Sequence, residues 1–589
     1  MLLYEVKPPP LSTGMGAASG HRRGGGHVRA SIAGSTTARP LAMPKVGRPV
    51  EADGVSSGPW WRGAVIYQIY PRSFVDSNGD GIGDLPGISA HLDYLVDLGV
   101  DALWLSPFYR SPMADFGYDV SDYTDVDPIF GTLEDFDRLV ESAHARGLRV
   151  IVDWVPNHTS EHHAWFVNSR SSRISAQRNW YIWRDPAPDG GPPNNWQSQF
   201  PRVGSGWSFD EPTGQWYLHS YLPAQPDLNW DNPAVVEAMS DVLRFWLRRG
   251  VDGFRVDVPQ RLGKDRAFRD NPGLANEPLA GFVGRRYDED QPATHEHLRG
   301  IRRVVDEFGD RLIVGEVYIL DQRRMTTYVN PGDELHLAHN FTFLRLDWDA
   351  SAFRRTLIEL EQSLDPAAWP AWCLGNHDHS RIASRFGADG RGQERARLIG
   401  LLLLTLRGTP FIYYGDELGL PDSAVPPDLA LDIHDRDRAR GPIPWLPTSR
   451  VGLGAGFSRV VPWLPVASNA EILNVDAQAA DPTSTLSMYR AILRLRRSST
   501  ALNAGPVEYL DGAREMLAYR RRSDFESWLI AFNFAVEPRL LEGVQGDVSD
   551  NDVAFTTIPD RPRLRMYRRR IMLEPLEGIV LRQHQGGGA

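Results

Sequence analysis

The feature that most constrains the fold of this chain is a repeated alternation of short apolar strands with longer helical segments. Segments of helical period, such as 88–99, 133–147, 233–250 and 486–497, lie between or after the strands. Eight segments rich in β-branched and aromatic residues are predicted strands, namely 65–71, 102–107, 148–155, 253–258, 311–317, 339–343, 371–378 and 409–417. Strand then helix, eight times over, indicates parallel pairing and predicts a (β/α)8 TIM barrel, an α/β fold. A doubly wound open sheet would give the same alternation, and periodicity alone does not exclude it.

Two stretches depart from this alternation, and a chain of 589 residues has room for more than one domain. Residues 158–230 are polar and rich in Trp, Asn, Gly and Pro, which predicts a small domain inserted after the third strand. Residues 501–589 contain short alternating runs typical of an antiparallel β domain. The barrel then comprises 59–157 and 231–500. Residues 1–58, rich in Gly, Ser, Arg and Pro, are expected to form a disordered leader.

Charge and cysteine content narrow the class of partner. The formal net charge of −11 disfavours nucleic acid, because phosphate binding needs a concentrated basic face. A small neutral ligand fits better. No apolar run is long enough for a membrane span. The single cysteine, Cys373, is compatible with a reducing compartment, so we expect a cytoplasmic protein. We further expect a monomer or homodimer that does not bind membranes.

The segment GFRVDVPQ, residues 253–260, ends an apolar strand with two charged residues on one face. Strand alternation places Arg255 and Asp257 on the same side. A guanidinium beside a carboxylate fixes its position and keeps it ionised, as a nucleophile requires. The same pair could equally be a salt bridge that caps a buried strand.

Other predicted strands also end in polar residues. The ends of the third, fourth, fifth and seventh strands carry Asp153 and Asn157-His158, Arg255 and Asp257, Glu316, and Asn376-His377-Asp378. In a barrel these ends meet at one mouth. Clustered carboxylates are costly without a purpose, but they suit the cleavage of a glycosidic bond by a nucleophile, an acid and a third carboxylate that stabilises the transition state.

Five motifs occur in an order that resembles one enzyme family. They are DWVPNH, QPDLNW, GFRVDVPQ, GEVY and LGNHDHSR. On these motifs the chain resembles the α-amylase family of glycoside hydrolases (family 13), in its α-glucosidase and oligo-1,6-glucosidase branch. The resemblance covers Trp60 to the C-terminus. It implies that Asp257 is the nucleophile, Glu316 the general acid and base, and Asp378 the transition-state stabiliser. The family retains anomeric configuration, so the Asp257 and Glu316 carboxyl groups should lie about 5 to 5.5 Å apart.

The resemblance also implies residues that hold the terminal sugar. Arg255 should keep Asp257 ionised, and His158 and His377 should donate hydrogen bonds to sugar hydroxyls. Tyr118 resembles a stacking tyrosine, and Asp115 the carboxylate that grips the 4-hydroxyl.

The usual partner of that carboxylate matches Arg440 in RDRARGPIPW, residues 436–445, a segment that departs from the branch at Gly441 and Ile443. The pair would close the pocket and impose exo action. Phe200 resembles an aromatic wall supplied by the inserted domain, although a core position is the alternative.

The segment DSNGDGIGDL, residues 76–85, carries carboxylates or amides at alternate positions and a glycine-rich turn, as in an oxygen-ligand cation loop. The family implies a structural Ca²⁺ or Mg²⁺ held by Asp76, Asn78, Asp80 and Asp84 with the carbonyl of Ile82, and no organic cofactor. The alternative is a glycine-rich turn with solvated acids.

These features predict a retaining exo-acting α-glucosidase for short oligosaccharides. The alternatives are an oligo-1,6-glucosidase, a transglucosylase or sugar isomerase of the same family, and a catalytically inactive scaffold relative. Val258 directly follows the nucleophile and resembles residues that often accompany α-1,6 activity, but one side chain shifts the ratio of rates only modestly, and the following Pro-Gln departs from the family's usual continuation.

Overall fold

The computed structural model describes residues 58–272, 285–542, 544, 549, 552–559, 561, 563–564 and 570–583. The leader expected at 1–58 lies outside these residues except for Gly58. Eight parallel strands form a closed barrel in the order β1-β13-β12-β11-β10-β9-β5-β2. They are β1 (Ile66–Ile69), β2 (Ala102–Leu105), β5 (Arg149–Trp154), β9 (Gly253–Val256), β10 (Leu312–Gly315), β11 (Leu337–Asn340), β12 (Ala371–Cys373) and β13 (Thr409–Tyr413). Because β1 pairs with both β2 and β13, the barrel prediction is confirmed and the open sheet excluded.

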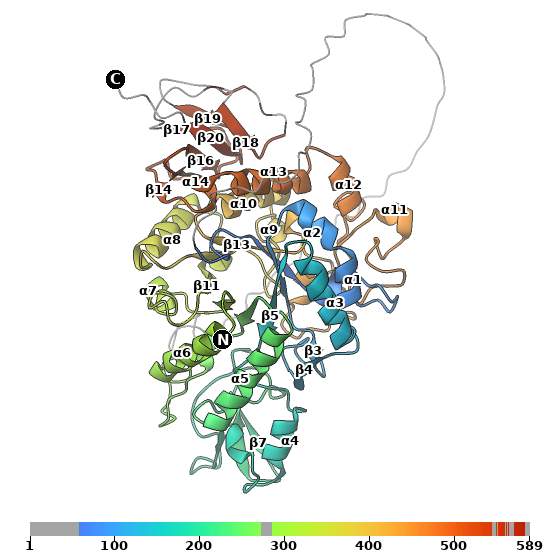
Figure 1. The fold of residues 1–589 in the computed structure, drawn as a ribbon, viewed down its shortest axis with the longest axis vertical. Helices are drawn as coiled ribbons and strands as arrows, with labels where there is room; N and C mark the ends of the chain where they lie inside the picture. Colours follow the sequence, from blue (N-terminus) through green and yellow to red (C-terminus); the bar gives the residue numbers. More distant parts are fainter. Residues whose placement is uncertain are drawn as a thin grey trace, which may run out of the picture. The chain divides into compact units, whose positions relative to one another are not determined.

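Helices connect the strands (Figure 1). The longer ones are α3 (Leu133–His144), α5 (Pro233–Arg248), α6 (Pro292–Asp306), α8 (Ala350–Ser363), α10 (Gly392–Thr405) and α13 (Thr485–Ser498). Shorter helices are α1 (Leu85–Ala90), α2 (Leu92–Leu98), α4 (Ala164–Ser171), α7 (Gln322–Thr326), α9 (Ile382–Arg385), α11 (Thr448–Val451), α12 (Val475–Ala480) and α14 (Thr500–Asn503). No helix among the described residues is both long and apolar enough to cross a bilayer.

The helix ends follow local chemistry. Thr132 and Asp135 form a capping box that begins α3, and the Asn232 side chain accepts from Ala234 N at the start of α5, where Pro233 needs no hydrogen-bond acceptor. Gly99 ends α2 with a left-handed φ of 99°. The segment 88–99, expected as one helix, is divided at His91, whose φ and ψ of −114° and 13° leave the helical region. The apolar period continues across that break, which is why the sequence pattern does not show it.

Two small sheets are formed by segments that connect elements of the barrel. Between β5 and α5 lies a three-stranded sheet of order β6-β8-β7, in the segment predicted as an insertion; the strands are β6 (Trp183–Arg184), β7 (Trp207–Asp210) and β8 (Gln215–Leu218). A short hairpin follows β2, made of β3 (Tyr109–Arg110) and β4 (Asp122–Val126).

The C-terminal segment forms an antiparallel sheet of order β14-β15-β16-β20-β18 beside a two-stranded pair, β17 and β19. These strands are β14 (Val507–Tyr509), β15 (Met516–Arg522), β16 (Ser527–Asn533), β17 (Arg539–Leu541), β18 (Val553–Thr556), β19 (Ile571–Leu573) and β20 (Gly578–Gln583). The predicted C-terminal antiparallel fold is therefore confirmed.

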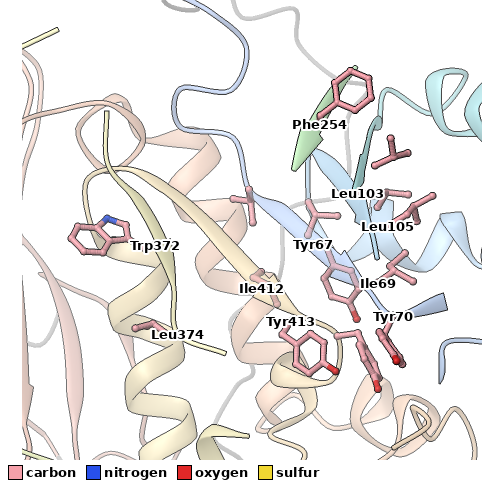
Figure 2. Packing of buried hydrophobic residues seen from close by; sticks show 14 of the residues in the cluster. Tyr67, Ile69, Tyr70, Leu103, Leu105, Phe254, Trp372, Leu374, Ile412 and Tyr413 are labelled. Atoms are coloured by element: carbon pink, nitrogen blue, oxygen red, sulfur yellow. The ribbon is translucent and has the colours of Figure 1, made fainter. Parts of the chain in front are cut away.

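Strand alternation separates two apolar cores. Alternate side chains such as Tyr67, Leu103 and Phe254 belong to the large cluster shared with the helices (Figure 2). The intervening residues, including Ile66, Trp104, Ile151, Val314 and Phe411, form a second, smaller cluster. Two positions beyond Ile151 and Val314, at the carboxyl ends of β5 and β10, the inner rows change from apolar residues to the carboxylates Asp153 and Glu316.

Candidate active site

The charged residues at the barrel mouth continue the inner rows of three neighbouring strands. Asp153 lies opposite Arg255 in the register of β5 and β9, and Val314 of β10 pairs with Arg255 on the other side. Two residues beyond Arg255 and Val314 come Asp257 and Glu316. Parallel pairing therefore places these three carboxylates around one arginine, although they are far apart in sequence.

Arg255 binds all three of these carboxylates. Its Nη1 lies 2.6 Å from Asp153 Oδ1 and 2.7 Å from Asp257 Oδ1, and its Nη2 lies 2.7 Å from Glu316 Oε2. The arginine is 1% exposed. Burial alone would lower its pKa, but Asp153 and Glu316 raise the pKa of Arg255 well above its usual value, so it stays cationic. The sequence left a strand cap and a site residue as equal alternatives for this pair, and the cluster favours the site.

The environment separates the protonation states of these carboxyl groups. Burial raises the pKa of Glu316 well above its usual range, and the negative charges of Asp257 and Asp378 and a hydrogen bond with Asp257 raise it further against the pull of Arg255. A raised pKa favours the protonated form of this carboxyl, as a general acid requires. Burial also raises the pKa of Asp153 to about 7, with Arg255 opposing.

Asp378 is held in the opposite state. Burial favours its neutral form, but His377, Arg436 and Arg440 outweigh burial and lower the pKa of Asp378 far below its usual value. Arg436 Nη1 lies 3.1 Å and Arg440 Nη2 3.0 Å from Asp378 Oδ1. The site therefore combines Glu316, a carboxyl group biased towards protonation, with an ionised Asp378.

A cavity of about 290 Å³ opens onto these groups. All three predicted catalytic residues line it, as do four of the predicted substrate residues, Asp115, Tyr118, His158 and Phe200. Phe200 stacks on His434 with ring centroids 3.9 Å apart, so it borders the cavity instead of filling a core. The hydrogen bonds from these side chains to a sugar stay predictions.

The other three predicted substrate residues do not line this cavity. Arg255 contacts Asp257 and Glu316, and Arg440 contacts Asp378, but neither arginine lines the cavity. The ring of His377 stacks on Tyr118 at 5.4 Å, its Nδ1 lies 2.8 Å from Gln68 Nε2, and its Nε2 lies 3.4 Å from Asp378 Oδ2. His377 is thus placed to orient Asp378 and Tyr118, and its direct contact with a sugar stays a prediction.

The pairing of Asp115 with Arg440 was wrong. Arg436 Nη2 lies 2.6 Å from Asp115 Oδ1, and Arg436 lines the cavity. Arg440 lies at the end of a 3-10 turn, Asp437–Arg440, and its Nε donates to the carbonyl of His377 at 2.9 Å. The turn sends the side chain of Arg440 beneath Asp378, and the arginine one turn earlier takes the place beside Asp115.

Sequence reasoning missed several cavity residues. They are Gln199, Pro201, Tyr221, Gln260, Glu289, Tyr318, Arg345, His379, His434 and Arg436. Tyr318 and His379 lie inside the GEVY and LGNHDHSR motifs, so their neighbours could have indicated them. Gln260 ends the GFRVDVPQ motif and Arg436 begins the segment RDRARGPIPW, so these segments could have indicated them as well. The others come from irregular connections, where no periodicity shows which side chain turns inward.

The predicted cation loop has oxygen donors of the right chemistry. Asp76 Oδ2 accepts from Gly81 N at 2.9 Å and from Ser458 Oγ at 2.6 Å, and Asp84 Oδ1 accepts from Gly87 N at 2.7 Å. Asn78 and Asp80 are exposed, and Asp80 Oδ1 accepts from Ile82 N at 2.8 Å. The described residues contain no cluster of three or more His, Cys, Asp or Glu side chains that could hold a metal. A cation in this loop stays a prediction.

Comparison with known proteins agrees with this geometry. The family model for the alpha amylase catalytic domain matches residues 68–505. The "Probable alpha-glucosidase" of Rhizobium meliloti is 44% identical over 505 residues, 81% of this chain and 90% of that protein. The oligo-1,6-glucosidase of Parageobacillus thermoglucosidasius is 37% identical, with the same coverage of 81% and 90%.

A solved structure, the alpha-glucosyl transfer enzyme XgtA, superposes with a TM-score of 0.83 at 39% identity, covering 90% of this chain and 100% of that one. The trehalulose synthase MutB, in its A258V variant, superposes with a TM-score of 0.81 at 34% identity, covering 89% of this chain and 100% of that one. The matching barrel, the carboxylate site at its mouth and these relatives lead to one conclusion: the chain belongs to the α-amylase family of glycoside hydrolases.

Proposed function

We propose that this protein is a retaining, exo-acting α-glucosidase that removes terminal α-linked glucose from short oligosaccharides by double displacement. The observation that carries the proposal is the Arg255 cluster, in which two guanidinium nitrogens bind Asp257 and Glu316 separately at the wall of one cavity. The side chains of Glu316 and Asp257 also share a hydrogen bond. Their carboxyl groups are therefore closer than the separation of about 6.5 to 9.5 Å that an inverting enzyme needs to admit a water molecule.

In the first step Asp257 attacks the anomeric carbon while protonated Glu316 gives its proton to the leaving oxygen. Arg255 keeps Asp257 oriented, and ionised Asp378 stabilises the positive charge that develops on the sugar ring. Forming the glycosyl ester removes the negative charge of Asp257. Because that charge is one cause of the raised pKa of Glu316, the pKa then falls and Glu316 becomes the base that activates water.

The ion pair between Arg436 and Asp115 supports exo action. It joins the loop after β13 to the loop after β2 at the cavity. Such a closure would limit the site to one terminal sugar residue. The 4-hydroxyl of a terminal glucose would bind the Asp115 carboxylate. A cytoplasmic location and a Ca²⁺ or Mg²⁺ ion with a structural role in the loop Asp76–Asp84 belong to the same proposal.

One experiment tests the proposal. Purified protein is given maltose, isomaltose, sucrose, trehalose and starch, and early products are followed by ¹H NMR and chromatography. Glucose released first as the α-anomer from the short sugars supports the proposal. Release of β-glucose, or cleavage of starch into oligosaccharides, contradicts it.

A transglucosylase is the second candidate, favoured by the likeness to XgtA and MutB. In that case the glycosyl ester is attacked by a sugar hydroxyl instead of water. The chromatogram distinguishes the two, because transfer yields new oligosaccharides or isomers at the expense of free glucose. An oligo-1,6-glucosidase is a further alternative, because Val258 lines the cavity. The rates on isomaltose and maltose in the same experiment distinguish it. An inactive scaffold is disfavoured, since all three carboxylates line the cavity.

A further inference from the structure

The cavity contains a second polar group of residues that the catalytic mechanism does not use. Gln260, Glu289 and Gln199 all line it, together with Val258 beside the nucleophile. Gln260 and Glu289 come from two described stretches of the connection between β9 and α6, and Gln199 comes from the inserted segment. None of the three contacts the Arg255 cluster through a hydrogen bond or ion pair among the described residues.

Gln260 is buried with an unsatisfied acceptor. Its side chain is 2% exposed, yet Oε1 has no hydrogen-bond partner among the described residues. A buried amide oxygen without a partner is unfavourable, so such a group in a binding cavity indicates a donor supplied by a ligand. The backbone fixes its direction: Val258 adopts a left-handed φ of 37°, and the 3-10 turn Pro259–Arg261 that follows carries Gln260 to the cavity wall.

Glu289 is a buried carboxyl group held in place on the same wall. Its Oε2 lies 3.1 Å from Arg261 Nη2, and the same nitrogen donates to Gln199 Oε1 at 2.7 Å. Arg261 is 1% exposed, so this fork is held inside the protein. Because Gln199 Oε1 is occupied, the amide group of Gln199 that remains for a ligand is its NH2 donor.

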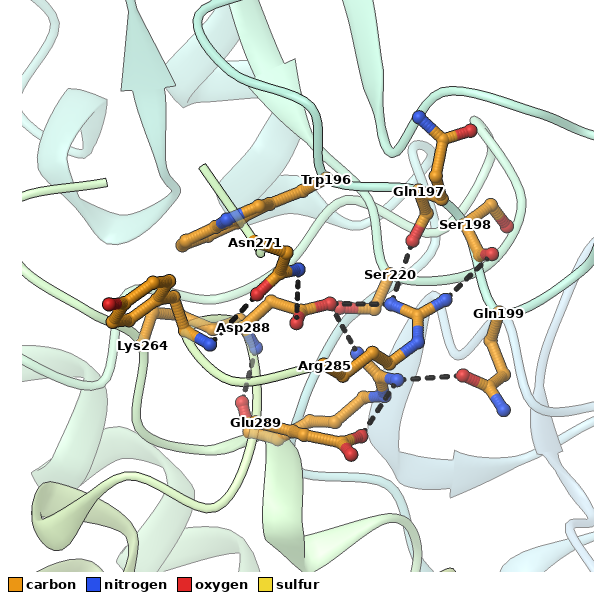
Figure 3. A network of polar contacts seen from close by, with 12 residues as sticks. Trp196, Gln197, Ser198, Gln199, Ser220, Lys264, Asn271, Arg285, Asp288 and Glu289 are labelled. Atoms are coloured by element: carbon orange, nitrogen blue, oxygen red, sulfur yellow. Dashed lines mark hydrogen bonds and ion pairs between the residues drawn. The ribbon is translucent and has the colours of Figure 1, made fainter. Parts of the chain in front are cut away.

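A network of ion pairs holds this wall in place (Figure 3). Arg285 Nη1 lies 2.5 Å from Asp288 Oδ2 and donates to the carbonyl of Gln197 at 2.8 Å, while its Nη2 donates to the carbonyl of Ser198 at 2.9 Å. The Asn271 amide donates to Asp288 Oδ1 at 2.8 Å. Two arginines thus balance Asp288 and Glu289 and join the inserted segment to the loop after β9, so the wall is preorganised before a ligand binds.

We propose that Gln260 and Glu289 bind the hydroxyl groups of the sugar on the leaving-group side of the scissile bond. The wall offers two acceptors and one amide donor, which complements a polyhydroxylated ring and not an aromatic or aliphatic group. The sugar is the leaving group in hydrolysis and the acceptor in transfer. This inference rests on the proposed function, because it assigns the second sugar of the same reaction.

The test compares two substrates that share the terminal glucose. Maltose or isomaltose has a hydroxylated leaving group, whereas nitrophenyl α-glucoside has none. In Gln260→Met the side chain keeps its length and loses the amide. We expect kcat/KM for the disaccharide, divided by kcat/KM for the nitrophenyl glucoside, to fall at least tenfold, and transfer to added glucose to fall in parallel. Glu289→Gln, which keeps size and removes charge, should lower the same ratio at least threefold.

Two controls separate binding from folding. Since Oε1 of Gln260 has no hydrogen-bond partner within the described part of the chain, Gln260→Met should keep the melting temperature of the parent or raise it. Asp288→Asn perturbs the same arginine network without lining the cavity, so it should change both substrates by the same factor.

An unchanged substrate ratio in Gln260→Met, or equal losses on both substrates, overturns the inference while turnover of nitrophenyl glucoside leaves the proposed function intact. If the parent protein cleaves no α-glucoside at all, the proposed function itself fails.

Discussion

Arg436 and Asp115 form an ion pair of 2.6 Å between two loops that are 321 residues apart in the chain. The same arginine contacts Asp378 Oδ1 at 3.1 Å and Asp432 Oδ1 at 2.6 Å. One guanidinium therefore joins the carboxylate proposed to grip the sugar to the carboxylate proposed to stabilise the transition state. We therefore expect a change at Arg436 to affect both sugar binding and catalysis.

Arg436→Ala is expected to lower kcat/KM for a short α-glucoside by about 100-fold or more, because it leaves the buried Asp115 and the partly exposed Asp378 without this partner. Steady-state kinetics measure the loss. Arg438→Ala is the matched control, since Arg438 lies two residues away, is half-exposed and pairs with Asp435 outside the cavity. Similar losses in both variants would contradict the role given to Arg436.

Asp257→Ala should abolish turnover of nitrophenyl α-glucoside, by about 10⁴-fold or more, because no other group can form the glycosyl ester. The variant should remain folded by circular dichroism. Added azide can occupy the vacated space and attack the anomeric carbon from the same face, so we expect β-glucosyl azide by NMR. Retained turnover without azide, or an α-glucosyl azide product, would show that Asp257 is not the nucleophile.

The pH profile of kcat/KM should report the raised pKa of Glu316 on its alkaline side. The acid must be protonated in the free enzyme, so activity is present below this pKa and is lost as pH rises through it. Asp378, with its pKa lowered, stays ionised across the neutral range and should not limit activity there.

α-Glucosyl fluoride provides the comparison for Glu316, since fluoride departs without a proton. At alkaline pH, kcat/KM for the fluoride should therefore fall less than kcat/KM for maltose. Glu316→Gln should release fluoride in a burst and then stall, because the base for the second step is missing. Identical limbs for both substrates and no burst would refute the assignment of Glu316.

Val258 contacts the cavity directly after the nucleophile, so its side chain should influence which linkage is preferred. Val258→Ala is expected to change the ratio of isomaltose to maltose hydrolysis by roughly 10-fold, the effect of removing methyl groups from an apolar wall. The ratio of kcat/KM values measures it. Val256→Ala would be a poor control because that side chain is buried in the core; Val96→Ala, on an exposed face of α2, is a matched one.

The loop Asp76–Asp84 can be tested for a cation without an activity assay. If Ca²⁺ binds, saturating calcium should raise the melting temperature by several degrees over EDTA, corresponding to about 2.7 kcal/mol at one hundred times Kd. Asp80→Ala removes an exposed carboxylate of the loop and should abolish the difference. An equal melting temperature in calcium, magnesium and EDTA would leave the loop as a turn held by its own hydrogen bonds.

The sequence alone determined the barrel and the positions of Asp257 and Glu316. The barrel and these two positions could be predicted from strand alternation and from short motifs at strand ends. In a strand, residues two positions apart lie on the same face. Asp378 was found in the same way, from the polar run that follows the seventh strand. The placement of these carboxylates at the barrel mouth follows from local secondary structure.

Only the tertiary structure decided which arginine meets Asp115 and which loop residues wall the cavity. Arg436 and Arg440 have the same charge and are four residues apart, and the intervening 3-10 turn directs one into the cavity and the other beneath Asp378. Gln199 of the inserted segment and Glu289 of the connection after β9 meet at Arg261, the chain neighbour of Gln260. Loops have no period, so long-range ion pairs and packing fix the direction of their side chains.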